Sequence, residues 1–187
     1  MSIMETYFKE KFPFSDDEIQ LIFSYFKKVE IKKGAYFLEA GQYCKKIAFI
    51  EEGAVVFYQL IDGDEKSCGF TFENDWITQY KSLIQNITSE LYIKALETTT
   101  LMEISLENML ELIAVLPKAI MLRTELAEEY FISSAQRASD LANLEAEEHY
   151  YKLIKDNPNL IHRVPQYYLA SYLGIKPQSL SRIRAKS

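Results

Sequence analysis

The sequence predicts an α+β protein with an antiparallel β sandwich or barrel, one long helix and a small helical domain at the C-terminal end. Residues 29 to 105 contain short runs rich in Val, Ile, Phe, Tyr and Thr. Turn signals separate these runs at intervals of roughly 8 to 12 residues, as in sandwiches and barrels. Residues 118 to 144 contain no Gly or Pro, which favours one continuous helix.

Composition favours a cytoplasmic globular protein. The chain has 187 residues, of which 48% are hydrophobic and 26% charged, enough for one larger and one smaller domain. Its start has no basic segment followed by an apolar one, and no apolar run approaches the roughly 18 residues of a membrane span. Cys44 and Cys68 are too few for a disulfide framework, and His149 and His162 are not spaced to form a metal site with them. We therefore expect neither a metal nor a membrane partner.

The stretch "SDDEIQLIFSYF" predicts a helix near the start of the chain. Ser15 is a suitable N-cap and Glu18 completes a capping box. The spacing of the apolar residues gives this segment one hydrophobic face, formed by Ile19, Ile22, Phe23 and Phe26.

The β region has one interruption. Its runs are separated by Gly34, Gly41, Gly53, "DGDE" and "END", whereas "WITQYKSLIQN" is expected to form a short helix. Aromatic residues are frequent in this region, and core packing is the more common role of such residues than cofactor binding. We expect core positions for Phe37, Phe49, Phe57, Phe70, Phe72 and Trp76.

The segment after the β region predicts a helix over "LENMLELIAVL", capped by Ser105, and then the long helix beyond Pro117. The apolar positions of the long helix suggest one face on the barrel and one stripe for a second copy of the chain. They are Ile120, Ala127, Tyr130, Phe131 and Ser134, with Leu126 and Leu141 nearby. The alternative is that the helix packs only within its own domain. We expect a sensor barrel over 1–116, a dimerisation helix over 117–143 and a third domain over 144–187.

The segment "VPQYYLASYLGIKPQSLSRIRAKS" predicts two helices joined by a tight turn. Pro165 suits a first helical position, Gly174 breaks the first helix and Pro177 begins the second. Spacing places six residues in the core between the helices: Leu169, Ala170, Leu173, Ile175, Leu180 and Ile183.

The opposite face of the second helix is polar and basic, carrying Gln178, Ser181, Arg182, Ala185 and Lys186. From residue 157 to 187 there are five basic and no acidic residues, a charge of +5, whereas the other 16 basic and 27 acidic residues give −11. Arg and Gln can pair with guanine and adenine in the major groove, Ser suits a base edge or a phosphate, and Lys suits phosphates. We therefore predict DNA binding through Gln178, Ser181, Arg182, Lys176, Lys186, Gln166 and Tyr167. The alternative is a structural helical hairpin with a polar outer face.

The motif "ASYLGIKPQSLSRIR" resembles the helix-turn-helix of the bacterial cyclic-AMP receptor and fumarate-nitrate regulator (Crp/Fnr) family, and "IKKGAYFLEAGQ" with "IEEGAVV" resembles its sensor barrel. This resemblance covers the whole chain. It implies a cyclic-nucleotide-binding-type jelly roll, a dimerisation helix and a DNA-binding helix-turn-helix, with operator DNA, a second subunit and, for an activator, RNA polymerase as partners. The family's base-contacting positions carry over to Gln178, Ser181 and Arg182.

The ligand-binding pattern departs from that family. Members that bind cyclic AMP have Gly-Glu at the start of the phosphate-binding segment and Arg followed by Ser or Thr at its end. Aligned on "ELYIKAL", the corresponding candidate ligand-binding residues are Phe72, Glu73, Ser89 and Glu90. Without the arginine a buried cyclic phosphate lacks a cationic partner, unless Lys94 or Lys81 replaces it. Cyclic AMP is therefore disfavoured, no cofactor is expected, and the small-molecule effector is unidentified.

Two further expectations follow. The chain ends a few residues after the second helix, which predicts a short form with little or no C-terminal wing and therefore weaker, more salt-sensitive DNA binding. No G-x-S-x-G, H-E-x-x-H or phosphate-loop motif is present, so we do not expect an enzyme. The competing hypothesis is a small-molecule or cyclic-nucleotide sensor module whose tail binds a protein partner instead of DNA.

Overall fold

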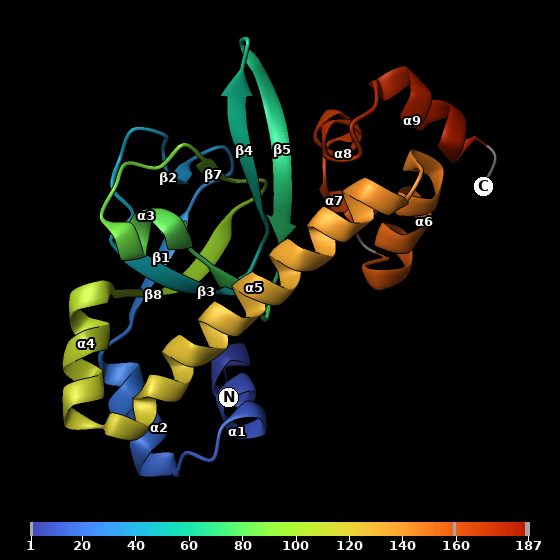
Figure 1. The fold of residues 1–187 in the computed structure, drawn as a ribbon. Coiled ribbons are helices and arrows are strands. Elements are labelled where there is room, and N and C mark those ends of the chain that lie inside the picture. Colours follow the sequence, from blue (N-terminus) through green and yellow to red (C-terminus); the bar gives the residue numbers. More distant parts are fainter. Residues whose placement is uncertain (1, 159, 186–187) are drawn as a thin grey trace.

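The computed structural model describes residues 2–158 and 160–185, and its centre is a sandwich of two four-stranded antiparallel sheets (Figure 1). The first sheet has the strand order β1 (Lys27–Ile31), β8 (Thr99–Ser105), β3 (Lys46–Glu52) and β6 (Trp76–Ile77). The second has the order β2 (Tyr36–Leu38), β7 (Tyr92–Ala95), β4 (Val55–Ile61) and β5 (Asp64–Thr71). With the helices described below, these sheets confirm the expected α+β class.

The hairpin formed by β4 and β5 is the longest in the sandwich and extends away from the rest of it (Figure 1). Its turn is Asp62-Gly63, and both residues have positive φ values, 54° and 84°. Two-residue turns of this kind match the right-handed twist of the flanking strands, which explains the Asp-Gly sequence. The outer strand β5 is the one that later meets the C-terminal helices.

Two helices precede the sandwich. The predicted capping box of α2 (Asp16–Ser24) is confirmed: the Glu18 backbone N–H donates to Ser15 Oγ at 3.2 Å, and the Ser15 N–H donates to Glu18 Oε2 at 2.7 Å. The first helix, α1 (Ile3–Lys11), was not predicted, and Ser2 caps it. Ile19 and Ile22 are buried as expected, and Phe26 is buried just beyond the helix end.

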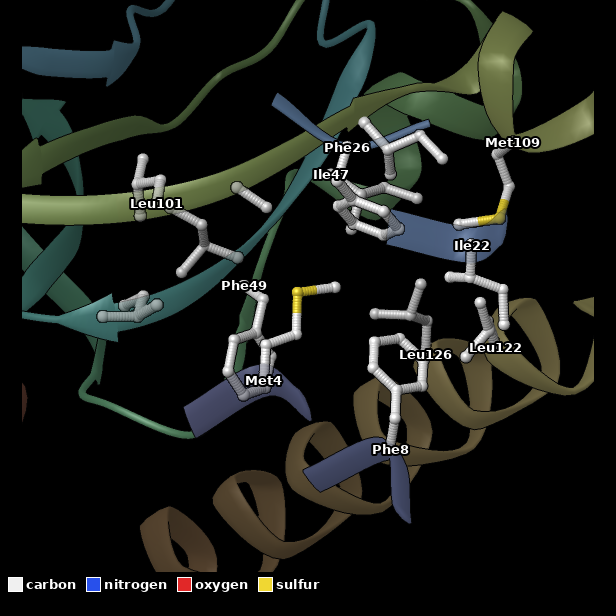
Figure 2. Close-up of a cluster of buried hydrophobic side chains, with 14 of the residues drawn as sticks. Met4, Phe8, Ile22, Phe26, Ile47, Phe49, Leu101, Met109, Leu122 and Leu126 are labelled. Atoms are coloured by element: carbon white, nitrogen blue, oxygen red, sulfur yellow. The ribbon is translucent and has the colours of Figure 1, made fainter. Parts of the chain in front are cut away.

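The main hydrophobic core joins these two helices to the sandwich and to the long helix (Figure 2). Met4 and Phe8 of α1 and Ile22 of α2 have no exposed surface. In the close-up Met4 lies beside Phe49 of β3, whereas Phe8 and Ile22 lie beside Leu126 and Leu122 of the long helix. Burying these side chains removes apolar surface from water and stabilises the fold by about 1.5 to 3 kcal/mol for each large side chain. The core therefore anchors the first half of the long helix to the sandwich.

The segments between the sandwich and the C-terminal helices agree largely with expectation. Ser105 caps α4 (Leu106–Val115) by accepting a hydrogen bond from the Asn108 N–H at 3.0 Å. Within "WITQYKSLIQN" only α3 (Tyr80–Gln85) is helical, because Trp76 and Ile77 pair with β3 as strand β6. A short 3-10 turn (Pro117–Ala119) leads into α5 (Ile120–Asn143), the 24-residue helix that runs across the molecule.

The C-terminal part contains α6 (Ala146–Asp156), α7 (Leu160–Arg163), α8 (Gln166–Tyr172) and α9 (Pro177–Arg184). Helices α8 and α9 form the predicted helix, turn and helix, with Gly174 at a φ of 70° in the turn. Pro165 is the N-cap of α8 and not its first helical residue. Five of the six predicted core residues are buried and Ile175 is partly buried, so the pattern was correct.

A second hydrophobic cluster joins these helices to the sandwich. It combines Val56 and Tyr58 of β4 with Tyr150, Tyr168 and other side chains of the C-terminal helices. Helix α8 lies beside β5 (Figure 1), and the Ser67 N–H donates a hydrogen bond to Ser171 Oγ at 3.0 Å. The helix-turn-helix is therefore docked on the outside of the second sheet. Among residues 2–158 and 160–185, the structure has no helix with both the length and the apolar character of a bilayer span.

Candidate nucleic-acid interface and ligand cavity

The outer face of α9 carries three of the predicted DNA-binding residues, Gln178, Ser181 and Arg182. Pro177 is the first residue of this helix, with Lys176 as its N-cap, and Leu180 and Ile183 turn the opposite face into the core. The outward face carries exposed residues at helical spacing, namely Gln178, Ser181, Arg182 and Ala185. Lys186 lies outside the described residues.

Gln166 of α8 fixes the position of α9. Its Nε2 donates to Ser181 Oγ at 2.6 Å and to the Pro177 carbonyl oxygen at 3.1 Å, and the Ser181 hydroxyl donates to the same carbonyl at 3.1 Å. Within residues 2–158 and 160–185, no hydrogen bond or ion pair engages the side chain of Gln178 or of Arg182. Gln166 and Ser181 therefore hold the two helices together, whereas the side chains of Gln178 and Arg182 are available to a ligand.

Tyr167, the remaining predicted DNA-binding residue, lies against the sandwich. Its hydroxyl donates a hydrogen bond to Glu65 Oε2 at 3.1 Å, although 45% of the residue is exposed. Partial burial and the neighbouring carboxylate raise the pKa of Tyr167 to about 12. In this arrangement α8 is bound to β5 near both of its ends, through Tyr167 and Ser171.

Arg163 at the end of α7 does not contribute to the basic face, because two acidic residues of the sandwich neutralise it. Its Nη1 and Nη2 donate to the two carboxylate oxygens of Glu73 at 2.7 Å each, and its Nε donates to Glu97 Oε1 at 3.1 Å. The guanidinium also lies over the ring of Phe72, 5.1 Å from the centroid. Burial alone would raise the pKa of Glu73, but hydrogen bonds from Arg163 and from the Gly53 backbone lower it.

The four predicted ligand-binding residues are divided between two places. Phe72 and Glu73 contact Arg163, as described above. Ser89 is buried, and its hydroxyl donates to the Leu91 carbonyl at 2.8 Å and accepts from the Leu91 N–H at 3.0 Å. Glu90 is exposed, 3.9 Å from the ammonium of Lys81. None of the four lines either of the hollows described below.

A cavity of about 420 Å³ lies between the second sheet and α5 and was not anticipated from the sequence. Strands β4 and β5 supply Phe57 and Phe70, the segment after β6 supplies Thr78 and Gln79, and α5 supplies several further residues. Tyr172 of α8 closes one side. The walls therefore combine aromatic rings with hydroxyl, amide and carboxylate groups.

Arg137 of α5 is the one basic residue among the described residues that line this cavity. Its Nη2 is 3.5 Å from the Ser67 carbonyl oxygen, and its guanidinium lies 4.1 Å from the ring centroid of Tyr172. Its Nη1 is shielded from solvent and makes no hydrogen bond within the described part of the chain. Lys94, considered above as a substitute for the missing arginine, is 3.8 Å from Glu65 and lies over the ring of Tyr36 instead.

The residues of the apolar stripe predicted on α5 lie in three different places. Leu126 is buried in the main core, and Tyr130 and Ser134 line the cavity. Ile120, Ala127 and Phe131 line an open groove of about 520 Å³ on the outer side of the helix. Phe131 is 72% exposed there, and the neighbouring Ile132 is 61% exposed. The outer groove is therefore an apolar surface that nothing in the described chain covers.

Comparison with known proteins agrees with this architecture. Residues 28–115 match the model of the cyclic nucleotide-binding domain. No curated protein sequence matches the chain.

Several solved structures share the fold over most of the chain. The c-di-GMP-responsive global regulator CLP of Xanthomonas campestris matches with a TM-score of 0.73 at 17% identity, over 92% of this chain and 91% of that one. A putative Crp/Fnr-family transcriptional regulator of Eubacterium rectale gives 0.72 at 16% identity, over 97% and 87%. The catabolite activator protein of Thermus thermophilus gives 0.60 at 18% identity, over 96% and 85%. The chain thus has the fold of Crp/Fnr regulators, which confirms the resemblance seen in the sequence.

Proposed function

We propose that this protein is a transcriptional regulator that binds operator DNA as a homodimer. Each subunit places α9 in the major groove of one half-site, with half-sites roughly 34 Å apart. The observation that carries this proposal is the outward face of α9, where Gln178 and Arg182 are exposed beside Ser181 on a helix that Gln166 holds in place. The fold shared with Crp/Fnr regulators supports the same assignment.

The distribution of charge supports a nucleic-acid partner. The body of the chain is acidic, with 27 acidic residues in the whole sequence and none beyond residue 156. Lys176 and Arg182 are exposed at or near the face of α9, whereas Arg163 is neutralised by Glu73 and Glu97. A short basic surface on an acidic protein is favourable for DNA binding that weakens steeply as salt increases.

The apolar outer groove of α5 supports the dimer. Phe131 and Ile132 are largely exposed in the single chain, and exposed apolar surfaces of this kind commonly mark protein interfaces. A second copy of the same helix would cover both residues. The helix would then act both as the dimer interface and as one wall of the ligand cavity.

In this proposal a small-molecule effector occupies the cavity between the sandwich and α5 and shifts the population between two dimer geometries. We do not expect cyclic AMP, because Ser89 and Glu90 stand where the nucleotide-binding members have Arg and a hydroxyl residue. The one hydrogen that the Ser89 hydroxyl can donate is also already bonded to the Leu91 carbonyl oxygen. The protein would act in the cytoplasm as a regulator and not as an enzyme, with RNA polymerase as a further partner if it activates transcription.

Selection from a random-sequence DNA pool tests the proposal. The purified protein is used at two salt concentrations, with and without cyclic AMP. We expect enrichment of a palindromic site, tighter binding at low salt and no effect of cyclic AMP. If no sequence is enriched under any condition, the regulator proposal fails and the competing hypothesis, a tail that binds a protein partner, replaces it.

A further inference from the structure

We propose that the cavity between the second sheet and α5 binds an aromatic anion, a carboxylate or phosphate ester, whose negative charge is held by Arg137. The proposal rests on the function proposed above in one respect, that this ligand is the effector. The recognition of the ligand is argued from the cavity. The residue that would bind the negative charge belongs to the long helix, whereas the family pattern places the corresponding arginine in the segment before β7.

The unpaired guanidinium nitrogen of Arg137 is the first argument. An arginine that is withdrawn from water without a full set of acceptors is costly, so buried guanidinium groups are normally paired with carboxylates or phosphates. Here Nη1 is buried without a hydrogen-bond acceptor in the described chain, and Nη2 has only the long contact with the Ser67 carbonyl. An anionic ligand would supply the missing acceptor, since the planar guanidinium fork suits carboxylate and phosphate oxygens.

The acidic residues of the cavity do not fill this role. Glu129 is bound by the ammonium of Lys11 at 3.0 Å. Asp75 accepts a hydrogen bond from the Trp76 N–H at 2.6 Å, and burial raises the pKa of its carboxyl group. Neither carboxylate is hydrogen-bonded to Arg137. The positive charge of Arg137 is therefore left for a ligand.

The remaining walls define the rest of the ligand. Phe57, Phe70 and Tyr130 offer aromatic surfaces, and Thr78, Gln79 and Ser134 offer hydrogen-bonding groups. A volume of about 420 Å³ is within the range of roughly 300 to 1,000 Å³ found for small-molecule sites. A flat apolar body with a single anionic group matches this arrangement.

The position of the site also connects it to the helix-turn-helix. The guanidinium of Arg137 already lies over the ring of Tyr172, which belongs to α8. A ligand at Arg137 therefore contacts the sandwich, the long helix and the first helix of the helix-turn-helix together. This is where a bound molecule would affect the docking of the C-terminal helices.

Isothermal titration calorimetry of the full chain with 1-naphthyl phosphate tests the proposal. The neutral 1-naphthol is the comparison ligand. We expect saturable binding of 1-naphthyl phosphate to the wild type and at least tenfold weaker binding to Arg137→Gln, with partial recovery in Arg137→Lys. Lys33→Gln removes one positive charge from an exposed position between β1 and β2 and should bind like the wild type. The naphthol should not distinguish the wild type from Arg137→Gln.

Thermal melting of each variant shows whether it is folded. If Arg137→Gln does not fold, the comparison is made with Arg137→Lys and with Ser134→Leu, which obstructs the cavity and should also weaken binding. The proposal is overturned if 1-naphthyl phosphate does not saturate the wild type, or if it binds the folded Arg137 variants as tightly as the wild type. Because this assay contains no DNA, its failure leaves the proposed regulatory function standing, and the DNA selection tests that function separately.

Discussion

Arg163 binds Glu73 through two parallel hydrogen bonds of 2.7 Å, across 90 residues of sequence. The pair joins the segment before the helix-turn-helix to the sandwich, and the two side chains are only 23% and 30% exposed. Glu73 also accepts the Gly53 N–H at 2.8 Å, so the carboxylate is held by three donors. The docking of the C-terminal helices on the second sheet thus depends on a charged pair as well as on apolar contacts.

Replacing Arg163 should reduce stability measurably. Arg163→Gln leaves the partly buried Glu73 with only the Gly53 N–H, and we expect a loss of about 1 to 2 kcal/mol in urea denaturation. Lys66→Gln is the matched control, because Lys66 pairs with Asp64 on the surface, where such pairs contribute only about 0 to 1 kcal/mol. Equal losses in the two variants would mean that the Arg163 pair has no special role in docking.

Buried His149 predicts a specific dependence of stability on pH. His149 is buried, and burial lowers its pKa below the ordinary value of 6.5, an effect that the nearby Asp140 only partly offsets. As the pH falls below about 6.5, the unfolded chain binds a proton at this residue that the folded chain resists, so the free energy of unfolding decreases until the folded pKa is reached.

Unfolding measured from pH 8 to pH 5.5 tests this expectation. His149→Gln should show a flatter profile than the wild type, whereas His162→Gln, at an exposed histidine, should follow the wild type. A wild-type slope that persists in His149→Gln would show that other groups cause it.

Gly53 should not tolerate a side chain. Its φ is 105°, and an added Cβ would lie 2.7 Å from the Thr99 Cα and 2.5 Å from its Oγ1. Because the clash involves backbone as well as side chain, we expect Gly53→Ala to lose at least about 2 kcal/mol of stability. Gly69→Ala is the control, since the nearest atom to its Cβ would be 3.9 Å away. Similar melting temperatures for the two variants would contradict this account of the β3–β4 turn.

The proposed dimer interface can be tested at Phe131. Phe131→Glu places a charge in the middle of the apolar groove of α5, and we expect sedimentation equilibrium to give the monomer mass of 21.8 kDa where the wild type gives twice that value. Leu60→Glu, which changes an exposed leucine on β4, should remain dimeric. A monomeric wild type would contradict the proposed dimer. A dimeric Phe131→Glu would show that the dimer does not form through this groove.

Features set by local sequence were predicted well. The capping box of Ser15 and Glu18 depends on residues three positions apart, and the core of the helix-turn-helix depends on spacing within two short helices. Helix α1 was missed, because nine residues with a weak apolar face are a poor local signal and their burial comes from the sandwich and α5. Strand β6 was included in an expected helix, because its pairing with β3 is not local.

The non-local parts of the site could not be predicted. Arg163 counts as one more basic residue in the sequence, and only the fold shows that Glu73 and Glu97 neutralise it. Glu73 was a candidate ligand-binding residue because of its place in the family pattern, but in the fold it binds Arg163 and does not line the cavity. No sequence pattern pointed to Arg137, because its environment forms only where α5 packs against β5 and α8.

The most direct test of the regulator proposal is the affinity of the protein for the selected operator, measured by fluorescence anisotropy for the wild type, Arg182→Ala and Lys33→Ala. Loss of one bidentate base contact costs roughly 1 to 3 kcal/mol, so Arg182→Ala should bind about 5 to 150 times more weakly and discriminate less at one base position. Lys33→Ala, which removes a positive charge from an exposed position between β1 and β2, should bind like the wild type. If Arg182→Ala folds and binds the operator as tightly and as selectively as the wild type, α9 is not the recognition helix and the proposal is contradicted.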